Sequence, residues 1–129
     1  GFIGNPPMNL FPSRVDDVDG RAVLVVGNQT VTIAGNTTAP RRTSITAGIR
    51  PEHVAVVERG AGTVDATVAH VERLGHETLV YVDMAGVRLV VRAAGMSALA
   101  PGERVALHLD PHQVHVFPPQ SATRTHPAS

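Results

Sequence analysis

Short stretches in which apolar and polar residues alternate recur along most of the chain. Because successive side chains of a strand point to opposite faces, such alternation predicts strands with one buried face. Residues 29–33 and 104–109 are clear examples, with an apolar residue at every second position. No longer window carries apolar residues at the spacing of an amphipathic helix. The pattern therefore predicts an all-β protein of about ten short strands with almost no helix.

Glycine-rich and proline-rich pairs separate these strands. Asp19-Gly20, Gly27-Asn28, Gly75-His76 and Ala85-Gly86 have the composition of tight hairpin turns, and Pro101-Gly102 suits the centre of a type II turn. We expect strands at residues 10–16, 21–26, 29–33, 43–49, 54–57, 62–74, 78–84, 87–93, 104–109 and 113–117.

The longest predicted strand changes phase along its length. Val64, Ala66 and Val68 are apolar at even positions, whereas Ala69 and Val71 are apolar at odd positions. A strand can keep both sets on one face only if it contains an extra residue. The sequence therefore predicts a β-bulge near Ala69 or His70, within a meander formed by this strand and the next two.

Many short strands with turns between them favour a small barrel or sandwich, because closure removes exposed strand edges. The chain has 129 residues, enough for one core, with 11 basic and 11 acidic residues and only 3% aromatic residues. It therefore has neither the net positive charge nor the stacking platforms that single-stranded nucleic acids require. Cysteine is absent, which excludes disulfides and thiolate metal sites.

Three motifs occur in order along the chain: GFIGNPPMN at residues 1–9, GIRPEHV at 48–54 and ERLGHET at 72–78. Together they resemble the C-terminal regulatory domain of the ATP-binding subunits of carbohydrate-type ABC importers, over most of the chain up to Phe117. The resemblance implies OB-fold-like barrels and a parent protein that hydrolyses ATP to drive import. It also implies a second copy of the subunit, membrane permease subunits and a regulatory protein as partners, at the cytoplasmic face of the membrane.

The first motif reads as a connector from an ATPase domain that precedes residue 1. Pro6-Pro7 excludes helix and favours extended backbone at Asn5. We expect residues 1–9 to form the connector to the ATPase domain, through Asn5, Pro6, Met8 and Asn9, with Met8 and Phe11 as apolar anchors. The alternative is an ordinary frayed start of the chain. Residues 10–117 then form the OB-like domain, and residues 118–129, rich in Pro, Ser, Thr and Ala, form a disordered tail.

The second motif places Arg50 and Glu52 on either side of Pro51. Pro51 fixes a bend there, so both side chains have a defined position. One hypothesis is that they contact a partner through charge-assisted hydrogen bonds. The alternative is that Arg50 or Glu52 pairs with nearby backbone and holds a corner of the barrel.

The third motif surrounds a hairpin tip with Glu72, Gly75, His76 and Glu77. In maltose-type relatives the corresponding region resembles a surface for regulatory contacts, to a second regulatory domain or to a regulator. His76 stands where the motif leads us to expect Asn. The alternative is a solvated turn. We further expect Leu79 on the outward face of the meander, in an apolar surface that contacts the second copy.

Catalytic chemistry is not predicted for this chain. A Walker A loop needs a lysine, and the sequence contains none, so ATP and Mg²⁺ are assigned to the preceding ATPase domain. No serine lies in a GxSxG elbow. His108, Asp110, His112 and His115 could suit a metal ion, but Pro111 interrupts their strand, and we predict no metal site.

Another class of function stays open. A related β-barrel of the molbindin type binds oxyanions between protomers, and the residues 30–38, TVTIAGNTT, offer the hydroxyl and turn donors that such a site needs. The order of the three motifs favours the importer domain over this alternative.

Overall fold

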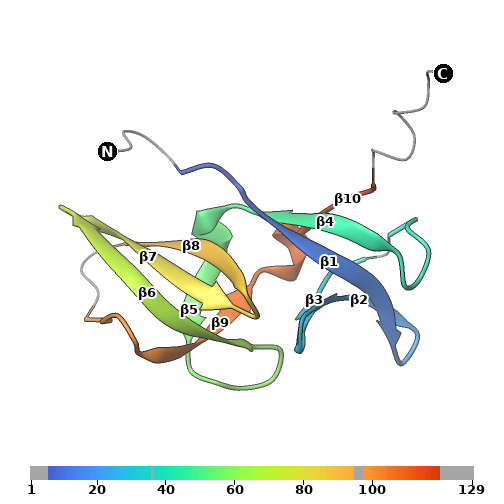
Figure 1. Ribbon diagram of the computed structural model, residues 1–129, viewed down its shortest axis with the longest axis horizontal. Helices are drawn as coiled ribbons and strands as arrows, with labels where there is room; N and C mark the ends of the chain where they lie inside the picture. Colours follow the sequence, from blue (N-terminus) through green and yellow to red (C-terminus); the bar gives the residue numbers. More distant parts are fainter. Residues whose placement is uncertain (1–5, 36, 95–97, 120–129) are drawn as a thin grey trace.

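The computed structural model describes residues 6–35, 37–94 and 98–119. Ten strands in this part of the chain form two five-stranded antiparallel sheets, as Figure 1 shows, and the helical content consists of two short 3-10 turns. The all-β class and the barrel-like architecture are therefore confirmed. Asn5 and residues 120–129, which belong to the predicted connector and tail, lie outside the described residues.

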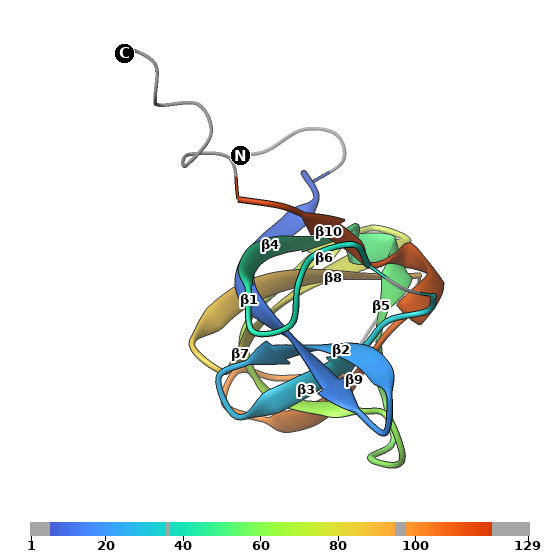
Figure 2. The same ribbon diagram turned by 90° about the vertical axis from the view of Figure 1, so that its right-hand side faces the viewer.

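The first sheet contains the first four strands and the last one, in the order β10-β4-β1-β2-β3. Its strands are β1 (Asn9–Val18), β2 (Arg21–Val26), β3 (Gln29–Thr32), β4 (Ser44–Ile49) and β10 (His115–Phe117). The beginning of β1 and the end of the described chain therefore lie on either side of β4. Figures 1 and 2 both place β10 and the start of β1 on the same side of the molecule.

The second sheet contains the middle strands in the order β5-β9-β6-β7-β8. These are β5 (Val54–Val57), β6 (Val64–Leu74), β7 (Glu77–Met84), β8 (Val87–Ala94) and β9 (Arg104–Leu109), and they include the predicted meander. The 3-10 turns η1 (Pro51–His53) and η2 (Pro111–Gln113) carry the chain into this sheet and out of it again.

The predicted bulge and turns are confirmed. The register of β6 against β7 shifts between Val68 and His70, so Ala69 is the extra residue. At the Ala85-Gly86 turn both residues have positive φ, 50° and 83°, as a two-residue type I′ hairpin requires. The change of phase in the alternating pattern therefore located the bulge correctly.

One apolar core joins the two sheets. Phe11, Leu24 and Ile49 of the first sheet belong to the same buried cluster as Val82 and Leu107 of the second. Two polar contacts also cross between the sheets: the Gln29 side chain accepts a hydrogen bond from the Asp65 main-chain nitrogen, and Asn9 bonds to Val90. The two sheets therefore pack as one unit.

Two expectations about the strands were wrong in detail. Asn9 lies in β1 and not in a connector, because its backbone pairs with Ile49 of β4. Gln113 lies in η2 and not in the last strand, since the Asp110 side chain accepts a hydrogen bond from the His112 main-chain nitrogen and holds the turn after Pro111.

Candidate interaction surfaces

The entry and exit of the described chain form an exposed apolar patch around Gly48 of β4. We call Met8, Leu10 and Phe117 the terminal patch, because a Cβ built on Gly48 would lie 2.6–3.1 Å from atoms of all three side chains. Only a glycine lets these side chains close over β4. Leu10 is 60% exposed and Phe117 41%, which is unusual for large apolar side chains in a small domain.

The predicted anchors of the connector divide between surface and core. Met8 is half-buried and contributes to the terminal patch, whereas Phe11 is only 1% exposed and belongs to the core. Phe11 cannot be an anchor for another domain, because on β1 it faces inward between exposed Leu10 and Pro12. Pro6 is half-buried.

Asn9 faces inward too. Its side-chain nitrogen donates to the Val90 carbonyl at 3.0 Å and its side-chain oxygen accepts from the Val90 nitrogen at 2.8 Å. The amide thus pairs with the free edge of β8 as another strand's backbone would. Asn9 is 7% exposed, so its side chain is engaged in a contact within this domain.

The corner that contains Arg50 and Glu52 is held by backbone. Pro51 is buried, and the Arg50 carbonyl accepts a hydrogen bond from the His53 nitrogen at 2.9 Å. The His53 carbonyl in turn accepts from the Asp110 nitrogen. Both Arg50 and Glu52 are exposed, and neither side chain has an ion pair within the described residues. The corner thus leaves both side chains accessible to a partner.

The hairpin tip between β6 and β7 projects as predicted. Leu74 pairs with Glu77 across a two-residue turn, and Gly75 takes the positive φ of 69° that the turn demands. His76 is exposed and Leu74 is 48% exposed. We call residues 72–77 the hairpin tip; it combines charged side chains with one exposed apolar one.

Behind the tip, Glu72 joins a small polar cluster with His70 and Tyr81. The Tyr81 hydroxyl donates to the Glu72 carboxylate at 3.2 Å, and the His70 ring lies 5.5 Å from the Tyr81 ring, centroid to centroid. Partial burial raises the pKa of Tyr81 above its ordinary value, and the hydrogen bond to Glu72 and its negative charge act in the same direction.

The expectation that Leu79 is exposed was wrong. Leu79 does lie on the outward face of the meander, but it is only 3% exposed. Its neighbours in the register are Glu72 on β6 and Arg92 on β8, and Arg92 forms an ion pair of 2.7 Å with Glu77. Leu79 is thus buried beside two long charged residues of the flanking strands, and an isolated strand pattern does not reveal such neighbours.

The outward face of the meander is also more polar than expected. It carries the ion pairs Arg88–Asp83 at 2.6 Å and Arg92–Glu77 at 2.7 Å, together with exposed Asp65 and Thr67. An apolar dimer surface on this face is therefore a wrong prediction. The exposed apolar residue near it is Leu74, at the hairpin tip.

No lysine is available for a phosphate-binding loop anywhere in the sequence. Within residues 6–35, 37–94 and 98–119, no group of three or more His, Asp or Glu side chains converges as metal ligands would. The described residues also contain no helix long and apolar enough to cross a bilayer.

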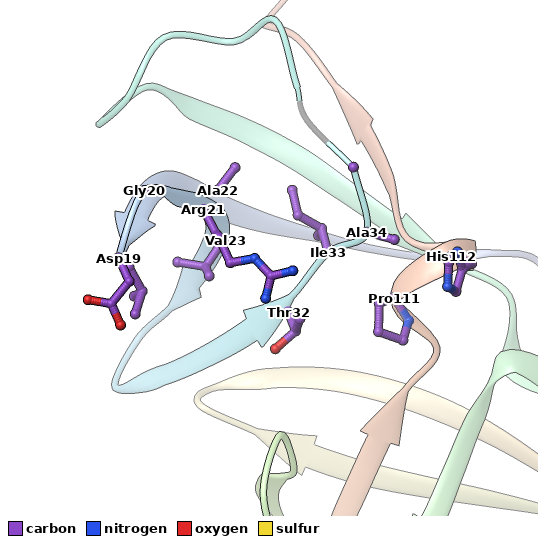
Figure 3. A pocket seen from close by; sticks show the side chains of 12 residues that line it. Asp19, Gly20, Arg21, Ala22, Val23, Thr32, Ile33, Ala34, Pro111 and His112 are labelled. Atoms are coloured by element: carbon purple, nitrogen blue, oxygen red, sulfur yellow. The ribbon is translucent and has the colours of Figure 1, made fainter.

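Sequence reasoning missed a cavity of about 650 Å³ at one end of the first sheet. The β1–β2 turn, the start of β2, the end of β3 and η2 line it, and Figure 3 shows its side chains. The main chain joins two of these segments, because the Ala34 nitrogen donates to the Pro111 carbonyl at 3.0 Å. These segments are far apart in sequence. The sequence suggested only the stretch that begins TVTIAG as part of a binding site.

Comparison with known proteins assigns the family. The TOBE domain model matches residues 47–117, more than half of the chain, and the MalK OB fold domain model matches residues 4–54. The chain belongs to the TOBE domain family. In this TOBE protein the OB match covers β1 to β4, which belong to the first sheet, and it ends at the start of β5, the first strand of the second sheet.

Similar curated proteins are ATP-binding subunits of importers. The TOBE chain is 36% identical to the sn-glycerol-3-phosphate import ATP-binding protein UgpC of Paracoccus denitrificans, over 96% of this chain and 34% of that protein. It is 31% identical to the maltose/maltodextrin import ATP-binding protein MalK of Vibrio vulnificus, over 91% of this chain and 33% of that protein. The chain thus spans about a third of the length of these relatives.

Among solved structures, the cytoplasmic molybdate-binding protein ModG has a similar fold. The TM-score is 0.68 at 14% sequence identity, over 86% of this chain and 96% of the ModG chain. At this identity the similarity supports the shared fold, and it says nothing about a shared ligand.

Proposed function

We propose that this TOBE domain is the regulatory and dimerisation domain of an ABC importer's ATP-binding subunit, for sugars or glycerophosphate-type solutes. The observation that carries the proposal is the pair of family matches, which together span residues 4–117. The importer subunits UgpC and MalK, which are similar over nearly the whole chain, support the same assignment.

In this proposal ATP and Mg²⁺ bind to a separate ATPase domain of the parent subunit. Hydrolysis there drives import through membrane permease subunits, and the assembled subunit lies at the cytoplasmic face of the membrane. The TOBE domain's part is mechanical: it keeps two subunits together while their ATPase domains open and close.

The terminal patch suits contact with the ATPase domain of the same polypeptide. Met8 belongs to the patch and to the segment that would lead to that domain, so the contact would need only a short connection. Leu10 is 60% and Phe117 41% exposed, so covering both completely would contribute roughly half of the 1.5–3 kcal/mol per side chain that full burial of an exposed residue gives.

The hairpin tip suits contact with the second copy or with a regulatory protein. Leu74 supplies apolar area there, and Glu72, His76 and Glu77 supply groups that could select a partner by charge. A stable dimer buries about 1,200–2,000 Å² in total, so contacts at the tip would have to extend to neighbouring surface such as the Arg50–Glu52 corner.

The test uses the full-length subunit that carries this domain, compared with a version lacking it. We expect the full-length subunit to bind and hydrolyse ATP with Mg²⁺ in the presence of its permease. The shortened version should still bind ATP but should form fewer dimers and hydrolyse ATP with weaker dependence on the permease. A full-length subunit that binds no ATP would overturn the assignment.

A further inference from the structure

The cavity at the end of the first sheet has the features of a small-molecule site. Its volume of about 650 Å³ lies within the range of roughly 300–1,000 Å³ that such sites occupy, and mouths of β-barrels are common places for them. Its lining comes from three separate segments: the Ala34–Pro111 hydrogen bond joins two of them, and the pairing of Val23 with Thr32 between β2 and β3 joins the third. The cavity is therefore built by the fold and does not depend on one loop.

Apolar side chains form much of its wall. Val18, Ala22, Val23, Ile33, Ala34 and Pro111 all contribute. Val23 lies on the opposite face of β2 from Leu24 and is therefore not part of the central core cluster. It is nevertheless buried. A ligand with an apolar body would find hydrocarbon surface here.

Arg21 supplies the cavity's cationic group. Figure 3 shows its side chain lying over the hairpin, with the guanidinium on the side of Thr32 and Ile33. Within the described residues Arg21 has no ion pair, in contrast to Arg41, which bonds to Asp17. An exposed, unpaired guanidinium can bind a carboxylate through two parallel hydrogen bonds.

The remaining polar lining limits the charge of the ligand. Thr32 offers a hydroxyl and His112 an imidazole, while Asp19 at the rim carries a negative charge. Figure 3 shows the Asp19 carboxylate turned away from the Arg21 guanidinium. A single guanidinium balances one negative charge, so the lining suits a monoanion better than a dianionic phosphate.

From this arrangement we infer that the cavity binds a small organic monoanion, a carboxylic acid with an aliphatic body. Its carboxylate meets Arg21, and its body lies against Val23, Ile33 and Pro111. This inference goes beyond the proposed role in dimerisation and does not depend on it.

The test titrates octanoate into the 129-residue chain and follows backbone amide signals by NMR. We expect saturable shifts at residues 18–23, 32–35 and 111–112. Octanol, which has a similar apolar body but no charge, should bind at least tenfold more weakly. Equal binding of octanol and octanoate would overturn the role of Arg21, and an absence of saturable shifts would overturn the site.

Two variants and a control locate the binding. Arg21→Gln should weaken octanoate binding at least tenfold, and Ala34→Trp should abolish it by filling the cavity without changing the charge. Arg104→Gln is the matched control, because Arg104 is also exposed and without an ion pair in the described chain but lines a different hollow. Unchanged binding by Arg21→Gln, or shifts centred on the terminal patch, would contradict the inference.

Discussion

Asn9 and Val90 lie 81 positions apart in the sequence, and two hydrogen bonds of 2.8 and 3.0 Å join them. The Asn9 side chain thereby covers the open edge of β8. It links β1 of the first sheet to this edge strand of the second sheet. The first motif predicted that Asn9 belongs to a link to another domain. Asn9 also stabilises the packing of the two sheets within this domain.

Asn9→Ala should therefore destabilise the domain. The substitution leaves the Val90 nitrogen and carbonyl without their partner in a nearly buried place, at a cost of about 1–3 kcal/mol. Asn9→Asp should cost more, because the new oxygen cannot donate to the Val90 carbonyl. Chemical denaturation measures both, with Asn28→Ala in an exposed turn as the control. Stability of Asn9→Ala equal to that of the unchanged chain would show that the bonds contribute nothing.

Leu79 and Leu74 face the same side of the meander but should respond differently to substitution. Leu79→Ala should cost about 2–5 kcal/mol, since Leu79 is 3% exposed. Leu74→Ala, at a site 48% exposed, should change the free energy of unfolding by less than about 1 kcal/mol. Thermal unfolding followed by circular dichroism measures both. Equal effects would mean that the side chains around Leu79 do not exclude water from it.

Gly48 should be sensitive to a single added methyl group. In Gly48→Ala the new Cβ would meet Met8 Sδ at 2.6 Å and Phe117 Cε2 at 2.9 Å, so these side chains must move. We expect a loss of no more than about 1 kcal/mol, because the atoms met are the ends of flexible side chains, of which Leu10 and Phe117 are exposed and can move aside. A double-mutant cycle with Phe117→Ala should recover part of that loss. A purely additive cycle would show that Phe117 does not lie over Gly48.

Tyr81 allows a direct check of the Glu72 contact, because it is the chain's single tyrosine and there is no tryptophan. Partial burial and Glu72 raise its pKa above the ordinary 10.0. The protonated phenol is thus favoured in the folded state. Its contribution to stability is complete below pH 10.0 and is lost as the pH rises through the raised pKa. Glu72→Gln should lower the pKa of Tyr81, measured by ultraviolet absorbance of tyrosinate. A pKa unchanged by Glu72→Gln would contradict the contact.

The sequence predicted features that depend on local pattern. The apolar residues of β6 change from even to odd positions between Val68 and Val71, and this change located the bulge. Successive side chains of a strand point to opposite faces, so an extra residue is needed to keep both sets on one face. The turn at Asp19-Gly20 was equally local, since both residues have positive φ, 52° and 80°, and Asp-Gly is one of the few residue pairs that readily adopt such angles.

Features that depend on contacts across the fold could not be read in this way. Leu79 is buried although it lies on the outward face, where its partners in the register are Glu72 on β6 and Arg92 on β8. The cavity beside Arg21 appears only when η2 is folded against the end of β3. Neither arrangement leaves a signal in the spacing of apolar residues.

The solution mass of the 129-residue chain over a concentration series tests the central claim of dimerisation most directly. We predict a dimer that forms as concentration rises and is lost in Leu74→Asp, while that variant keeps its fold by circular dichroism. Val57→Asp, at another exposed apolar site, should dimerise normally. A chain that stays monomeric at the highest concentration, or a dimer that Leu74→Asp leaves intact, would contradict dimerisation through the hairpin tip.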